Sequence, residues 1–138
     1  MRNELRAYLD AQVLAALLEQ GAAADVYGAI GRLPRTVSLF TSELTLMEVL
    51  VGPEQRHEED LIRRYDELFT KPEGLTILTV DTLVLRLAAK ERARHPWMTA
   101  NDAIHVVSAR VADAQCWLTY NPNWARLGTS QVRVLSPR

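Results

Sequence analysis

The chain has 138 residues, of which 48% are hydrophobic and 24% charged, and its formal net charge is −1. This size and composition predict one globular domain, residues 1–138, with enough apolar side chains for a substantial core. The near-neutral charge excludes a general basic field for nucleic acids. The single cysteine, Cys116, fits a reducing compartment, and we see neither a signal peptide nor a bilayer-spanning run, so we expect a cytoplasmic protein with no membrane contact.

Short β-like runs alternate along the chain with longer runs of helical periodicity. The expected strands are Leu5–Asp10, Thr36–Phe40, Leu75–Val80, Cys116–Thr119 and Gln131–Leu135. The expected helices cover residues 11–19, 23–33, 43–51, 55–69, 82–94 and 99–112. Strands separated by helices predict an α/β fold with a parallel sheet that is covered on both faces.

Cap and turn residues set the expected ends of these helices. The stop signals are Gly21, Pro34 and the pair Gly52–Pro53. The N-caps are Ser42, Asp81 and Thr99. Thr99 is followed three residues later by Asp102, a spacing that resembles a capping box.

Two polar residues stand directly after expected strands. Asp10 ends the first strand, and Asn121 follows the fourth. In open parallel sheets, ligands bind beyond the carboxyl ends of the strands, at the point where the strand order reverses. If the first and fourth strands are neighbours at that point, the two side chains converge.

Two further acids, Glu48 and Asp102, join this set. Glu48 interrupts an apolar helix face, and Asp102 opens an apolar helix. Carboxylates in such surroundings are costly unless something pairs with them, and a hard divalent cation with oxygen ligands is a common partner. A metal site made of oxygens alone indicates phosphate chemistry.

Each candidate also has an ordinary explanation. Asp10 is well placed to cap the following helix. Glu48 could form an ion pair with an arginine across the core. The helix dipole favours an anion at Asp102, and an asparagine before proline, as at Asn121, is a good turn former.

Four motifs, in this order and at these intervals, resemble the PIN domain family, and in particular the VapC-like toxins of toxin–antitoxin pairs. They are YLDAQVL at 8–14, SELTLMEVL at 42–50, TANDAIH at 99–105 and WLTYN at 117–121. The resemblance runs from Tyr8 to Leu135. It implies a three-layer α/β/α sandwich with a parallel sheet of about five strands.

The resemblance also implies a function. Family members are metal-dependent endoribonucleases that hydrolyse RNA phosphodiester bonds with metal-activated water. It implies Mg²⁺ or Mn²⁺ held by Asp10, Asp102 and Glu48, with Asn121 as a fourth site residue and Thr119 and Gln12 in support. The implied partners are an RNA substrate, an antitoxin that lies in a groove, and a second copy in a homodimer. The apolar residues of 13–33 and 61–69 could line this groove or could simply belong to the core.

The chain departs from the family pattern at one important position. The family usually has Asp where this chain has Asn121, and often another acid at Asn123. An asparagine keeps an oxygen ligand but removes one negative charge. The alternative hypothesis is therefore a catalytically weakened module that binds RNA or a protein partner.

Three further features have more than one interpretation. Arg86, Lys90, Arg92 and Arg94 could form an RNA-contacting stripe or a solvated helix face. His105 could approach the substrate, but a solvated or core-edge position is its ordinary role. A phosphoryl-accepting receiver domain, with Asp81 after the third strand, is a remote third hypothesis, since no lysine follows Leu135.

Overall fold

The computed structural model describes residues 4–31 and 36–136, and within them five strands form one sheet. The strands are β1 (Glu4–Leu9), β2 (Thr36–Ser42), β3 (Leu75–Leu78), β4 (Cys116–Thr119) and β5 (Val132–Val134). Their order is β3-β2-β1-β4-β5, and every neighbouring pair is parallel. The predicted parallel α/β fold is confirmed.

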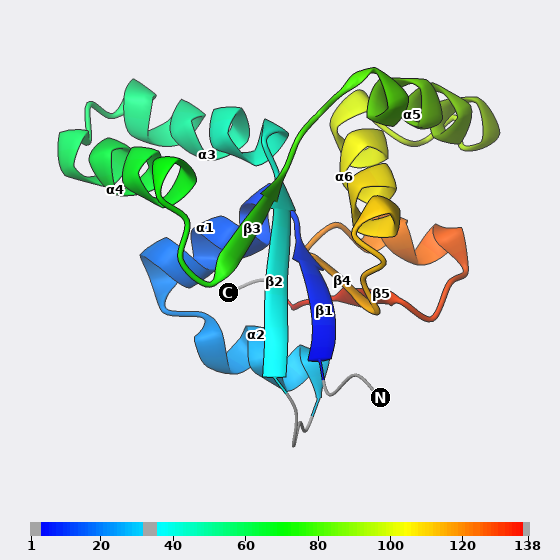
Figure 1. The fold of residues 1–138 in the computed structure, drawn as a ribbon, viewed down its shortest axis with the longest axis horizontal. Helices are drawn as coiled ribbons and strands as arrows, with labels where there is room; N and C mark the ends of the chain where they lie inside the picture. The colour runs from blue at the N-terminus through cyan, green and yellow to red at the C-terminus, as the bar shows by residue number, and fades with distance from the viewer. Residues whose placement is uncertain (1–3, 32–35, 137–138) are drawn as a thin grey trace.

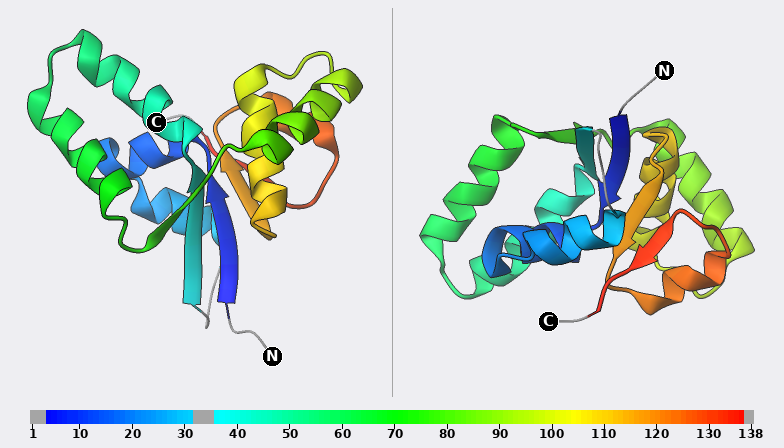
Figure 2. Two further views of the ribbon diagram at one scale, coloured as in Figure 1. Left: turned by 45° about the horizontal axis from the view of Figure 1, so that its top comes forward. Right: turned by 90° about the horizontal axis from the view of Figure 1, so that it is seen from below.

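Helices cover both faces of the sheet. They are α1 (Ala11–Gln20), α2 (Ala23–Ile30), α3 (Leu44–Gln55), α4 (Glu59–Thr70), α5 (Thr82–Arg94), α6 (Ala100–Val111) and a short 3₁₀ helix η1 (Pro122–Leu127). Helices α1 and α2 lie on one face, α5 and α6 on the other, and α3 and α4 pack against each other to one side (Figures 1 and 2). No helix in the described ranges is both long and apolar enough to cross a membrane.

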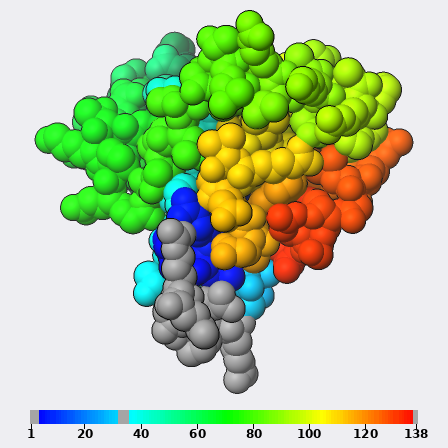
Figure 3. Space-filling view, turned by 45° about the vertical axis from the view of Figure 1, so that its right-hand side comes forward, coloured from blue at the N-terminus to red at the C-terminus, as the bar shows by residue number. Residues whose placement is uncertain are grey.

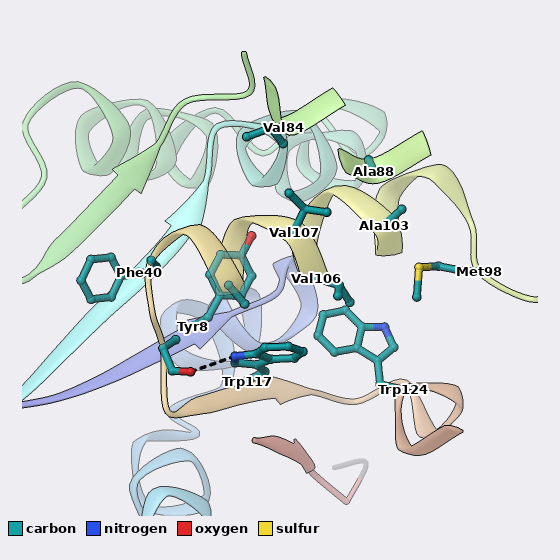
Figure 4. Packing of buried hydrophobic residues seen from close by; sticks show 13 residues of the cluster. Tyr8, Phe40, Val84, Ala88, Met98, Ala103, Val106, Val107, Trp117 and Trp124 are labelled. Atoms are coloured by element: carbon teal, nitrogen blue, oxygen red, sulfur yellow. Dashed lines mark hydrogen bonds between the residues drawn. The ribbon is translucent and has the colours of Figure 1, made fainter. Parts of the chain in front are cut away.

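The face toward α5 and α6 holds an aromatic core. Tyr8 of β1, Trp117 of β4 and Trp124 of η1 are fully or almost fully buried there, against Val106 and Val107 of α6 (Figure 4). The indole Nε1 of Trp117 donates a hydrogen bond to the Ala114 carbonyl, 3.0 Å away. The large rings thus fix the distance between α6 and the sheet.

The opposite face holds an aliphatic core. Its buried members include Leu9, Val13, Val26, Cys116 and Leu118, from β1, α1, α2 and β4. The apolar side chains of α1 and α2 therefore serve this core, and the prediction that residues 13–33 line a groove for a partner is wrong for Val13 and Val26, which are 0% exposed. The buried position of Cys116 is as expected for a small hydrophobe.

The strand order places the end of β1 beside the end of β4. Leu9 pairs with Leu118, and the Asp10 amide donates to the Leu118 carbonyl at 3.2 Å. The chain moves outward from β1 through β2 to β3 and then returns to the other side of β1, so the order reverses between β1 and β4. This order also excludes the receiver hypothesis, because that class has the order 2-1-3-4-5.

The predicted end of α3 is wrong. We expected Gly52–Pro53 to stop the helix, but α3 continues to Gln55, and α4 begins only at Glu59. Pro53 is buried, so tertiary packing outweighs the weak local signal for a break. The turn is made instead at His57, whose φ is 56°.

Most other predicted boundaries agree with the structure to within one or two residues. Gly21 ends α1 with a φ of 62°, and Asp81 and Thr99 cap α5 and α6 with their side chains. Strand β2 extends to Ser42, whose hydroxyl accepts from the Leu44 amide at 3.1 Å. Helix α2 ends at Ile30, and Gly31 is its C-cap with a φ of 105°, so the predicted continuation of this helix to Leu33 is wrong. The expected stop signal Pro34 lies outside the described residues.

Candidate active site

The four candidate residues line one cavity of about 340 Å³ at the carboxyl end of the sheet. Asp10 follows β1, Glu48 lies on α3, Asp102 is in the first turn of α6, and Asn121 follows β4. The complete lining is Asp10, Ala11, Gln12, Glu48, Asp102, His105 and Asn121. Side chains that are up to 111 positions apart in sequence thus meet where the strand order reverses.

Asp10 is 7% exposed, and within residues 4–31 and 36–136 its hydrogen-bond donors are uncharged. Its Oδ1 accepts from the Val13 amide at 3.0 Å, and its Oδ2 from the Thr119 hydroxyl at 2.5 Å. The cap expected for α1 therefore exists, but the same carboxylate also lines the cavity. Burial raises the pKa of Asp10 above its ordinary value, although the bonds from Thr119 and Val13 and the nearby His105 oppose that rise.

Asp102 is held by two donors from the segment after β4. Its Oδ1 accepts from the Trp124 indole at 3.1 Å, and its Oδ2 from the Asn121 amide nitrogen at 3.3 Å. No motif in the sequence reveals the bond between Trp124 and Asp102. A buried tryptophan needs a partner for its N–H, which is the one signal that could have suggested this bond.

The partners of Asn121 fix the orientation of its amide. Its Oδ1 accepts from the Asn123 backbone N–H at 3.0 Å, while its Nδ2 faces the Asp102 carboxylate. If the amide were flipped, its N–H₂ group would face the Asn123 N–H, and its oxygen would face the Asp102 carboxylate, so both hydrogen bonds would be lost. Asn121 therefore presents a donor to Asp102, whereas an aspartate there would present a second negative charge.

Glu48 has a partner that the sequence did not reveal. Its Oε1 lies 2.6 Å from Nε2 of His105, and its Oε2 accepts from the Asn101 side chain at 3.2 Å. The alternative explanation for Glu48 was an ion pair with an arginine across the core. Among the described residues no arginine pairs with Glu48, and its close partner is His105. A solvated His105 is also excluded, because its side chain is only 3% exposed and lines the cavity.

The donor set fits a hard divalent cation. Each of the six carboxylate oxygens of Asp10, Glu48 and Asp102 accepts one hydrogen bond from the protein, which leaves a lone pair on each oxygen for a further partner. In residues 4–31 and 36–136, however, no three acidic, histidine or cysteine side chains already stand close enough to hold an ion. A cation would therefore have to draw the carboxylates together.

The predicted basic stripe lies outside this cavity. Arg86, Lys90, Arg92 and Arg94 are on α5, which borders α6 on the face seen in Figure 3. The Arg92 side chain donates to the Met98 carbonyl at 3.3 Å, and Arg94 lies 3.8 Å from Glu91. Gln12, in contrast, does line the cavity.

The chain was compared with protein families, curated proteins and solved structures. The family model described as PIN domain matches residues 7–129. A search of curated proteins found no significant match.

Three solved structures share the fold at low sequence identity. VapC20 of Mycobacterium tuberculosis, a toxin that cleaves the sarcin–ricin loop, is 17% identical, with a TM-score of 0.71 over 92% of this chain and 98% of that chain. VapBC2 of Rickettsia felis, bound to a promoter DNA fragment, is 13% identical, with a TM-score of 0.69 over 96% and 100%. A toxin–antitoxin complex from Klebsiella pneumoniae is 20% identical, with a TM-score of 0.64 over 91% and 94%.

The matched family model covers most of the chain. The chain therefore belongs to the PIN domain family.

Proposed function

We propose that this protein is a divalent-metal-dependent endoribonuclease that acts as the toxin of a toxin–antitoxin pair. One observation carries the proposal: Asp10, Glu48 and Asp102 line one cavity, and in the described chain none of them forms an ion pair with a lysine or arginine. Membership of a family of nucleases supports it.

In this proposal Asp10, Asp102 and Glu48 hold Mg²⁺ or Mn²⁺. The ion would make water more acidic and stabilise the negative charge that develops on the phosphate. The carboxylates are oriented before any ion arrives, Asp10 by Thr119 and Val13, and Asp102 by Trp124 and Asn121. Binding would still require a shift that brings these oriented carboxylates together around the ion, because they do not yet lie close enough to hold it.

RNA binding would combine the cavity with the basic stripe on α5. Gln12 lines the cavity and can donate to a phosphate oxygen. Arg86 and Lys90 lie on α5, and no hydrogen bond or ion pair within the described chain occupies their charged ends, so both can bind the RNA backbone. The RNA sequence is not specified by these two side chains if they reach phosphate rather than base edges.

The test combines Mn²⁺ titration calorimetry with an RNA cleavage assay on the wild type, Asp10→Asn and Asp102→Asn. We expect the wild type to bind Mn²⁺ and cleave RNA, and both variants to lose both properties while circular dichroism shows an unchanged fold. Undiminished cleavage by both variants would reject the proposal.

The orientation of Asn121 favours one alternative. Because its amide nitrogen faces Asp102 and its oxygen is bonded to Asn123, the site has three carboxylates where the family resemblance implies a fourth. A weakened PIN domain would bind RNA or a partner without cleaving it. Strong activity gained by Asn121→Asp, from an inactive wild type, would support this alternative, and a robustly active wild type would exclude it.

We also propose an antitoxin as the protein partner. The Klebsiella structure is a toxin–antitoxin complex and shares the fold. Exposed apolar side chains of α3, Met47 at 54% and Val51 at 48%, lie on the helix that carries Glu48 and offer a contact surface. A homodimer in the cytoplasm is part of the same proposal, and light scattering of the isolated protein would test the oligomeric state.

A further inference from the structure

Glu48 is the one long side chain among the three acids that are proposed to bind the ion, and it is 22% exposed. The helix itself is anchored by the buried Thr45 and Val49, but the Glu48 side chain lies beside Met47, which is largely exposed, and is not enclosed by packing. A glutamate in such a place has three rotatable bonds, and fixing them costs side-chain entropy. Its carboxylate therefore needs specific partners if it is to stay in one position.

Helix α6 supplies one partner to each oxygen of Glu48. The Asn101 side chain donates to Oε2 at 3.2 Å, and Nε2 of His105 lies 2.6 Å from Oε1. Asn101 and His105 are four residues apart, so they lie on the same face of α6, one turn above the other. The carboxylate is thus held at both oxygens by a single helix.

A third residue, Tyr8, contacts the other ring nitrogen of His105. The Tyr8 hydroxyl lies 2.7 Å from Nδ1, and Figure 4 shows it pointing toward α6. A carboxylate oxygen can only accept, so Nε2 must carry the hydrogen that faces Glu48, and in a neutral imidazole Nδ1 must then accept from Tyr8. Tyr8 is 0% exposed and His105 is 2% exposed, so water does not compete for the bond between them.

We propose that Asn101, His105 and Tyr8 are positioning residues that fix the Glu48 carboxylate in the cavity. They form a chain of hydrogen bonds from β1 through α6 to α3. The inference rests on the proposed function in one respect, which is that Glu48 is positioned for a divalent cation. Groups that orient a metal ligand typically contribute about 10- to 100-fold to metal affinity or activity.

The first test compares two variants of His105 by Mn²⁺ titration calorimetry. A glutamine can place its amide nitrogen near the position of imidazole Nε2, whereas an asparagine reaches only as far as Nδ1. We expect His105→Asn to weaken Mn²⁺ binding by about 10- to 100-fold. We expect His105→Gln to restore affinity to within about threefold of the wild type, which is a smaller loss than that range. Thermal melting confirms that both variants fold.

The second test needs neither metal nor activity. Two-dimensional ¹H–¹⁵N spectra of the wild type should show His105 with its hydrogen on Nε2, and Glu48→Gln should shift that signal. Tyr8→Phe removes the donor to Nδ1 and should shift the Nδ1 signal, while the hydrogen stays on Nε2 because the Glu48 carboxylate can only accept.

The outcomes separate the two proposals. If the wild type binds no Mn²⁺ and Asp10→Asn behaves identically, the proposed function is rejected, and the spectra alone decide whether the positioning chain exists. If the wild type binds Mn²⁺ but His105→Gln is as weak as His105→Asn, the Nε2 bond does not position Glu48. A hydrogen found only on Nδ1 of His105 in the wild type would also overturn the inference.

Discussion

Two buried carboxylates of this protein have opposite surroundings. Asp10 is 7% exposed and accepts hydrogen bonds from an amide and a hydroxyl, both uncharged. Glu91 of α5 is 3% exposed, and it forms a short ion pair with Arg110 of α6, with Arg94 3.8 Å away and His95 3.7 Å away. The Arg110 guanidinium lies over the Trp117 ring, 5.5 Å from its centre.

This difference distinguishes a carboxylate that holds the fold together from one that is available to a ligand. The chain itself supplies arginine cations for Glu91, both at Oε1, and they offset part of the cost of its burial, although Oε2 is buried without a hydrogen bond in the described residues. For Asp10 it supplies only dipoles and the imidazole of His105, and burial consequently raises the pKa of Asp10. An unneutralised buried acid in a cavity is a candidate for function on physical grounds.

Cleavage activity should separate the two acids most strongly. We expect Asp10→Asn to reduce RNA cleavage by more than about 100-fold, since removal of a direct ligand should exceed the 10- to 100-fold typical of groups that orient ligands. Glu91→Gln should leave the rate per folded molecule essentially unchanged. Steady-state cleavage at saturating Mn²⁺ measures both, and equal losses in the two variants would remove the distinction.

Stability should depend more on Glu91 than on Asp10. Glu91→Gln leaves Arg110 and Arg94 without their anion, and we expect it to lower the free energy of unfolding by about 1–3 kcal/mol. The cost falls below that of a fully buried pair because the Arg110 side chain is 44% exposed. Urea unfolding followed by circular dichroism measures the change, and an unaltered midpoint would contradict it.

A new negative charge beside Asp102 should make the stability of the cavity depend on Mn²⁺, whereas the Glu91–Arg110 pair has its cation within the chain. Asn121→Asp replaces a donor 3.3 Å from Asp102 Oδ2 with a second carboxylate. We expect it to lower stability by about 1–2 kcal/mol in EDTA, because one hydrogen bond is removed and like charges meet. Saturating Mn²⁺ should reverse this destabilisation, and melting temperatures with and without Mn²⁺ test it, with Asn123→Asp as the control.

The pH dependence of stability should reveal the unneutralised charge of Asp10. Its pKa in the folded protein is above the ordinary value of 3.8, so the folded state binds this proton more tightly than the unfolded chain does. Its contribution to stability is full below 3.8 and declines as the pH rises through the folded pKa. In EDTA, the unfolding free energy of Asp10→Asn minus that of the wild type should therefore increase from about pH 4 to about pH 7. A difference that stays constant across this range would contradict the prediction.

The smallest expected effect concerns the basic stripe on α5, the helix that also carries Glu91. The double variant Arg86→Gln/Lys90→Gln should weaken RNA binding and reduce the slope of log affinity against log salt by about 0.7 for each phosphate that is no longer neutralised. Metal affinity should not change. Binding to a labelled single-stranded RNA at several salt concentrations tests this, and an unchanged slope would assign the stripe to solvent.

The α/β class, the parallel sheet and the four candidate residues of the cavity could all be predicted from the amino-acid sequence. Hydrophobic periodicity and cap residues are local signals, and parallel strands bring their carboxyl ends to one edge of the sheet. The position of Asp10 and Asn121 after strands that become neighbours was therefore readable before any coordinates. The predictions that failed, such as the stop at Gly52–Pro53, relied on local propensity where packing was stronger.

The groups that the acids contact, in contrast, became known only from the folded chain. His105 meets Glu48, and Trp124 meets Asp102, because α6 faces α3 on one side and the segment after β4 on the other. Packing likewise gave cations to Glu91 and neutral donors to Asp10, although both are simply acids in the sequence. Hydrogen-bond partners and desolvation depend on distances between elements, whereas periodicity describes one element at a time, and this is why these pairings could not be predicted.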